Sequence, residues 1–324
     1  MICKKMLQGS FATGRYTSTV LFVLSMLVML AACWLPTSSA GIAQPGIPVL
    51  LCGFVPRIVS LVIYVFAAVL LSRQTFFDRR MKWMGALYLW LVAVSTFVNG
   101  NPIIAFSSLL FLASIILLLL CQYSANPVGI LFTSFMLLGI LILVTPFSLY
   151  LIPLYLAFGF FANVFSARGI SASLLGLVTP FWLVVGTAYV FSCTETFIEP
   201  LWEELTDVCN VEFPGFSILL LLLLALILVV LLPASITFFG GTSPSKPLLR
   251  RRFSYIIVVN IYLLLLFCTV SSGAGFFYMC QLPCTAILTS YLFAKKESKL
   301  SNVYFVIVNA IIVAIATQSL CLML

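Results

Sequence analysis

The chain contains no histidine, and only 7% of its 324 residues are charged. The missing histidine excludes Ser-His-Asp triads, zinc sites of the HExxH type and histidine proton relays. The segment Gly240–Lys246 has glycines and a lysine, but their spacing does not match a phosphate-binding loop. We therefore identify no catalytic residue, and we expect no metal site and no cofactor.

Carboxylates are equally scarce, and none of the 8 Asp and Glu residues falls in an apolar run. Intramembrane carboxylates are the usual carriers in proton-coupled and cation-coupled transport, so their absence disfavours a proton-driven pump. The paired aspartates of membrane prenyltransferases are missing. So is the acidic residue that polyprenol-dependent glycosyltransferases normally carry in their first external loop.

Apolar residues make up 63% of the chain, against roughly 45–50% in a soluble domain. A helix crosses the bilayer with about 20 apolar residues, so this length leaves no room for a separate soluble domain. We expect an all-α, polytopic transmembrane helix bundle that forms a single integral membrane domain over residues 1–324. Breaking the apolar runs at Gly, Pro, Asn and charge clusters predicts eleven spans, near 17–35, 48–71, 82–98, 102–121, 128–144, 146–165, 170–192, 215–235, 253–270, 275–294 and 301–323.

The first span ends in Leu30-Ala31-Ala32-Cys33, which matches the short box of bacterial lipoproteins. Ten further predicted spans make cleavage unnecessary for export. We expect an uncleaved anchor.

The basic residues predict the orientation. Fifteen of the 16 Lys and Arg residues lie at ends and loops that share one side of the membrane if the N-terminus is cytoplasmic and the C-terminus is external. These are Lys4, Lys5, Arg15, Arg73, Arg79, Arg80, Lys82, Arg168, Lys246, Arg250, Arg251, Arg252, Lys295, Lys296 and Lys299. We therefore expect a multi-pass protein of the bacterial cytoplasmic (inner) membrane whose basic residues are orientation signals. These residues account for the net charge of +8, so no nucleic-acid partner is needed to explain it. They can also contact membrane lipids.

One predicted external loop, residues 193–214, carries most of the acidic side chains. They are Glu195, Glu199, Glu203, Glu204, Asp207 and Glu212. Apolar positions spaced four, four and three apart predict a short amphipathic helix here, with carboxylates that stay in water or hold a divalent cation or a basic partner. Cys193 and Cys209 bracket this helix, and in an oxidising compartment a disulfide between them would contribute about 3 kcal/mol.

Arg57 is the one basic residue outside the orientation pattern. If the regular helix begins at Pro56, Arg57 lies in its first turn, where free N–H groups and a guanidinium make a site for a lipid phosphate or diphosphate. The alternative is an arginine that snorkels to the outer headgroups or pairs with the acidic loop.

Polar residues within the predicted spans are few, and most are expected to form hydrogen bonds between helices. They are Ser107, Ser108, Thr133, Ser134, Asn163, Asn260, Gln281, Asn309 and Gln318. Prolines at Pro153, Pro180 and Pro283 interrupt three spans, and such irregular backbone can line a cavity. Cys280 and Cys284 lie one helical turn apart, but without His or a nearby carboxylate we expect them to pack rather than to bind metal.

The stretch from Phe76-Phe77-Asp78 to Leu174-Leu175-Gly176-Leu177-Val178-Thr179-Pro180-Phe181, about a third of the chain, shows three features in order. They are an aromatic-acidic start to one span, a turn with proline, and a single basic residue before a Gly-x-x-x-Pro helix. In these features the chain resembles a family of uncharacterised multi-span inner-membrane proteins of Bacteroidota. The resemblance implies an envelope protein and supplies no catalytic residue.

Two classes of function remain. The first is a non-enzymatic envelope protein, either a scaffold in a membrane-protein complex or a permease or flippase for a lipid-linked or amphipathic substrate. The second is a polyprenyl-phosphate-dependent membrane transferase that acts at the outer face with acid-base groups from Glu195 to Glu212. We favour the first, because the six carboxylates lie on a loop rather than on a rigid element near the bilayer.

Overall fold

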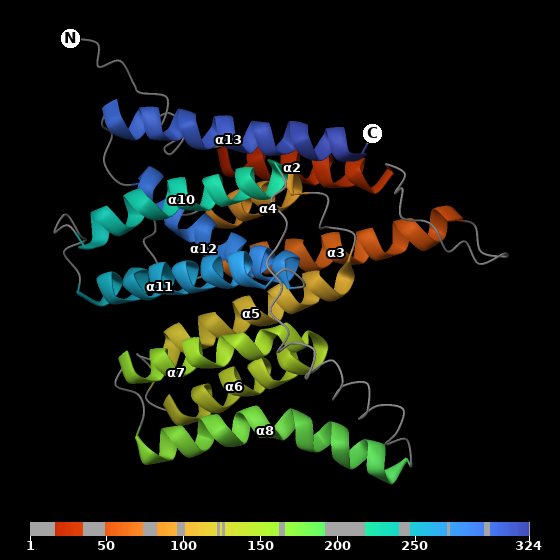
Figure 1. Cartoon of the computed structure of the whole chain (residues 1–324), viewed down its shortest axis with the longest axis vertical. Coiled ribbons are helices and arrows are strands. Elements are labelled where there is room, and N and C mark those ends of the chain that lie inside the picture. Colours follow the sequence, from red (N-terminus) through yellow and green to blue (C-terminus); the bar gives the residue numbers. More distant parts are fainter. Residues whose placement is uncertain are drawn as a thin grey trace. The chain divides into compact units, whose positions relative to one another are not determined.

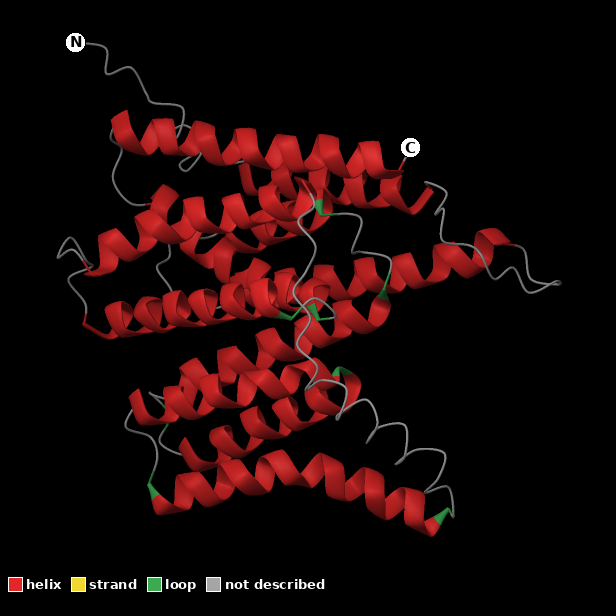
Figure 2. Cartoon of the chain, viewed as in Figure 1, coloured by secondary structure: helices red, strands yellow, loops and turns green. Residues whose placement is uncertain are grey.

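The structure is a computed structural model that describes residues 17–34, 49–73, 83–95, 101–121, 124, 127–161, 166–191, 218–239, 247–270, 273–294 and 299–323. Helices make up nearly all of these residues, and no strand occurs among them (Figure 2). The predicted all-α class is therefore confirmed for this part of the chain.

Within these ranges the chain forms eleven α-helices and one 3-10 helix, and each predicted apolar run overlaps at least one of them (Figure 1). In chain order they are α2 (Thr17–Trp34), α3 (Val49–Ser72), α4 (Met84–Val94), α5 (Pro102–Cys121), α6 (Pro127–Val144), η3 (Pro146–Leu151), α7 (Ile152–Phe161), α8 (Ala167–Val190), α10 (Ile218–Phe239), α11 (Pro247–Thr269), α12 (Ala274–Ala294) and α13 (Lys299–Met323).

Six of the described helices, namely α3, α5, α6, α8, α11 and α12, are long and apolar enough to cross a membrane. The described apolar stretches of the others are shorter. The chain is thus a helical, apolar bundle of the kind found in integral membrane proteins. The eleven-span count and the orientation of the termini stay predictions.

Three helices differ from their predicted limits. α4 has only 11 residues, because the backbone leaves helical geometry at Ser95. The predicted span 146–165 begins as the 3-10 helix η3 and continues as α7, since Pro146 and Pro153 have no N–H to give to an α-helix. α11 begins at Pro247, a favoured first helical residue, so the basic cluster 250–252 lies in the helix rather than before it.

The described helices divide into two compact units. One comprises Met1–Ala105, Gly215–Leu264 and Gln281–Leu324, and the other comprises Phe106–Pro214 and Leu265–Cys280. Both contain candidate membrane spans, so a single membrane domain stays the prediction.

In the first unit, α4 packs against α2, α3 and α13, and α10 packs against α13. Gly85 lets α4 approach α3 closely, because a Cβ at this position would collide with the Ala68 carbonyl and the Ser72 hydroxyl. The ring of Phe293 stacks on Trp83 at a centroid distance of 5.7 Å and meets Phe305 edge-on at 4.9 Å. Aromatic contacts of this kind add about 0.5–1.5 kcal/mol beyond burial.

In the second unit, α6 and α8 run side by side (Figure 1). Buried residues on α8 recur at spacings of four, three and four, namely Gly169, Ser173, Gly176 and Pro180. A Cβ at Gly176 would collide with the Phe132 carbonyl, and one at Gly139 would lie 2.7 Å from the Leu177 carbonyl oxygen. Two helix backbones thus meet at small residues, as membrane helices commonly do.

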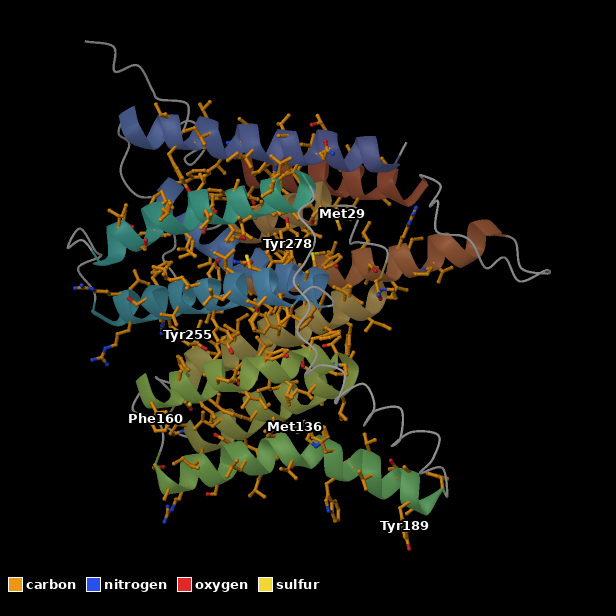
Figure 3. All side chains as sticks on the ribbon, in the orientation of Figure 1. Met29, Met136, Phe160, Tyr189, Tyr255 and Tyr278 are labelled. Carbon is orange, nitrogen blue, oxygen red and sulfur yellow. The ribbon has the colours of Figure 1, made fainter. Side chains whose placement is uncertain are left out.

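The opposite face of α8 is exposed and apolar. Trp182 and Tyr189 are 75% and 78% exposed, and Tyr189 lies at the C-terminal end of α8 with its side chain pointing away from the helix (Figure 3). Arg168 lies exposed at the other end. With 24 residues, α8 is about 36 Å long, so the basic and aromatic ends are separated by the thickness of a bilayer.

Candidate functional site

The helix α12 differs from the other candidate spans in two ways. It is the least apolar of the six, and every residue from Phe276 to Phe293 is buried. Pro283 lies inside it and has no N–H for the carbonyl one turn earlier. In a membrane protein, polar groups and interrupted helices belong in the protein interior, so α12 is where a polar site is expected.

The main polar contact of α12 in the first unit is between two amide side chains, Gln281 and Asn260 of α11. Gln281 Nε2 donates to the backbone oxygen of Asn260 at 3.1 Å and to its side-chain Oδ1 at 2.8 Å. Both residues are 0% exposed. The expectation that Asn260 and Gln281 form hydrogen bonds between helices is confirmed.

This contact leaves half of each amide without a partner. Asn260 Nδ2 and Gln281 Oε1 are buried and find no hydrogen-bond partner among the described residues. An unsatisfied buried donor or acceptor costs about 1–3 kcal/mol. The pair therefore holds one free donor and one free acceptor inside the helix bundle.

Two hydroxyls continue this polar face along α12. Thr285 and Thr289 follow Gln281 at intervals of four residues, and both are buried. Thr285 donates to the Leu282 carbonyl at 2.8 Å, and Thr289 donates to the Thr285 carbonyl at 2.6 Å. These protons are used within the helix, so each hydroxyl oxygen keeps lone pairs for a further hydrogen bond.

A second polar cluster, in the other unit, is internally satisfied. Ser114 of α5 and Ser134 of α6 donate to each other's backbone carbonyl at 2.9 and 3.0 Å, and Tyr155 of α7 donates to Ser114 Oγ at 2.8 Å. Sequence reasoning marked Ser134 but missed Ser114 and Tyr155. A signal was available, since Ser107 and Ser114 lie seven residues, or two turns, apart on one face of α5.

Two further predicted polar residues bond within their own helices. Thr133 donates to the Gly129 carbonyl and Asn309 to the Phe305 carbonyl. Ser107 Oγ is buried without a partner among the described residues, whereas Gln318 is only half-buried. Asn163 lies outside the described residues.

Arg57 lies within α3 and is half-buried. The helix begins at Val49 and continues through Pro56, so Arg57 is in its third turn and not in a first turn that starts at Pro56. The free N–H groups of a helix start are therefore not beside the guanidinium. A lipid-phosphate contact through Arg57 alone stays a prediction.

The acidic loop lies outside the described residues. This applies to Glu195, Glu199, Glu203, Glu204, Asp207 and Glu212, and to the proposed disulfide between Cys193 and Cys209. The roles of these carboxylates and the disulfide therefore stay predictions.

Cys280 and Cys284 are buried thiols within α12. Among the residues that the structure describes, no group of three His, Cys, Asp or Glu side chains could hold a metal ion. The described residues include no Asp or Glu at all.

The polar site of α11 and α12 is thus neutral, since it consists of amides and hydroxyls. Such groups bind and orient a ligand by hydrogen bonds, but they supply no general acid or base at neutral pH. No family model, curated protein or solved structure matches this chain.

Proposed function

We propose that the chain is a multi-pass protein of the bacterial cytoplasmic membrane that acts as a permease or flippase for a lipid-linked or amphipathic substrate. Six helices long and apolar enough to cross a membrane support the membrane location. The alternation of basic and uncharged loops supports a cytoplasmic N-terminus and an external C-terminus. The resemblance to inner-membrane proteins of Bacteroidota supports a bacterial envelope.

The outward face of α8 supports direct contact with lipid. Its exposed side chains between Arg168 and Tyr189 are mostly apolar. An arginine at one end and aromatic rings at the other suit the two headgroup levels of a bilayer.

One observation carries the transport function: the half-satisfied amide pair of Asn260 and Gln281, which lies close to Pro283 in the buried helix α12. A protein that only holds partners together gains nothing from an unpaired donor and acceptor in its interior. Transporters, in contrast, bind substrates near the middle of the membrane with buried polar groups of their helices. The alternative is a scaffold role within a membrane-protein complex, and experiments must distinguish it from transport.

Copurification gives the first test. The protein is purified in mild detergent, and bound lipids and proteins are identified by mass spectrometry. We expect a lipid-linked or other amphipathic molecule in near-stoichiometric amount. A stoichiometric protein partner without such a lipid would favour the scaffold.

Reconstitution gives the second test. Liposomes with the protein and a fluorescent polyprenyl-linked lipid are treated with dithionite, which bleaches only the outer leaflet. We expect bleaching beyond the outer-leaflet fraction in liposomes that contain the protein. Bleaching equal to that of empty liposomes would contradict a flippase.

A further inference from the structure

The free atoms of the amide pair can be identified from the hydrogen bonds themselves. The side-chain atom of Gln281 that lies 3.1 Å from the backbone oxygen of Asn260 must be its nitrogen, because a carbonyl accepts only from a donor. The Asn260 atom 2.8 Å from that nitrogen must then be its oxygen. Asn260 Nδ2 as donor and Gln281 Oε1 as acceptor are therefore the unpaired atoms.

A donor beside an acceptor selects the chemistry of a ligand. A hydroxyl group both donates and accepts, so it can satisfy Asn260 Nδ2 and Gln281 Oε1 together. An ionised phosphate only accepts and would leave Gln281 Oε1 unpaired, and an ammonium only donates. No Asp or Glu occurs among the described residues to neutralise a cation.

Thr285 and Thr289 of α12 also favour a ligand with hydroxyl groups. Thr285 and Thr289 present oxygen lone pairs on the turns that follow Gln281, about 6 Å apart along the helix. A head group with several hydroxyls, such as a glycerol or a sugar, can donate to them in turn.

We propose that Asn260 and Gln281, continued by Thr285 and Thr289, form a binding site for the uncharged, hydroxyl-bearing head group of an amphipathic molecule. The inference rests on the proposed transport function and adds the chemical class of the substrate at this site. Pro283, between Gln281 and Thr285, removes one backbone hydrogen bond from the helix beside this site, because proline has no N–H for the carbonyl one turn earlier.

Two probes that differ only in a phosphate test the site. The full-length protein in nanodiscs is titrated with 1-monooleoylglycerol or with 1-oleoylglycerol 3-phosphate, and the melting temperature Tm is followed. We expect monooleoylglycerol to raise Tm by about 3 °C near saturation, since a ligand that binds only the folded state stabilises it. The phosphate analogue should raise it much less.

An apolar double variant ties the effect to the amides. Asn260→Leu with Gln281→Met keeps side-chain size and removes both partners together, so no buried polar atom is left alone. It should fold and lose the Tm response to monooleoylglycerol. Ser134→Ala, a buried polar change in the other unit, is the matched control and should keep the response.

Several outcomes would overturn the site. They are no Tm response of the wild type to monooleoylglycerol, an equal response to the phosphate analogue, or a full response in the double variant. If the double variant does not fold, Gln281→Met, which keeps Asn260, provides the same comparison. A normal Tm response without lipid flipping in liposomes would refute the transport function and leave the binding site intact.

Discussion

Ser114 and Ser134 form a reciprocal pair in which each hydroxyl donates to the backbone carbonyl of the other residue, at 2.9 and 3.0 Å. This geometry fixes the register of α5 against α6. Tyr155 adds a third helix by donating to Ser114 Oγ at 2.8 Å.

We predict that Ser114→Ala lowers the free energy of unfolding by about 1–2 kcal/mol, because it removes two hydrogen bonds and leaves the Tyr155 hydroxyl without this acceptor. Thermal unfolding in detergent measures the change. Thr133→Ala is the control, since Thr133 is exposed and bonds only to its own helix. Equal losses in the two variants would show that the cluster does not stabilise the packing.

The α6–α8 contact yields a prediction on two glycines of the same helix. Gly176→Ala should destabilise by about 1–3 kcal/mol, because its Cβ would meet the backbone of α6 at Phe132 and Met136. Gly186→Ala has nothing within 4 Å of its Cβ and should be neutral or stabilising by up to about 1 kcal/mol. Similar unfolding temperatures for the two variants would contradict this close approach.

The proposed orientation predicts which fusions are active. A reporter enzyme that works only outside the cytoplasm should be active after Leu324 or within 195–212, and inactive after Arg79. An inactive fusion at Leu324 with an active one at 205 would remove one span from the count.

Arg57 is expected to contribute to the binding of an anionic lipid. Arg57→Ala should reduce copurified anionic lipid about tenfold, the loss of a charge-assisted hydrogen bond, and Arg57→Lys should restore only part of it, because an ammonium lacks the planar fork. Quantitative lipid analysis of the purified variants measures the amount of bound anionic lipid, and a normal expression level serves as the control. Unchanged lipid in Arg57→Leu would mean that the arginine only snorkels.

The positions of the helices were largely predictable from sequence. An apolar run of about 20 residues in a bilayer forms a helix, because every backbone N–H and C=O group must then be hydrogen-bonded within the protein. The residues at which helices begin were less predictable where a proline lies near the start. Pro146 begins a 3-10 helix, whereas Pro247 begins α11 before its arginines.

The polar partners were only partly predictable. The sequence marks Asn260 and Gln281 as polar residues in spans, but which atoms pair depends on the rotation of α11 against α12. Ser114 was missed because serine is common in membrane helices, and its role depends on the Ser134 carbonyl of another helix. Arg57 was expected in a first turn, but the helix continues through Pro56.

The low apolar content of α12 also affects how the protein is made. A segment with Gln281, three buried Ser and Thr side chains and a proline partitions into lipid less readily than α5, the most apolar candidate span. During synthesis it therefore depends on helices that are already inserted, above all on α11, whose Asn260 offers its first polar partner. The five more apolar candidate spans precede α12 along the chain, so they can insert into the membrane before it and provide the contacts that α12 needs.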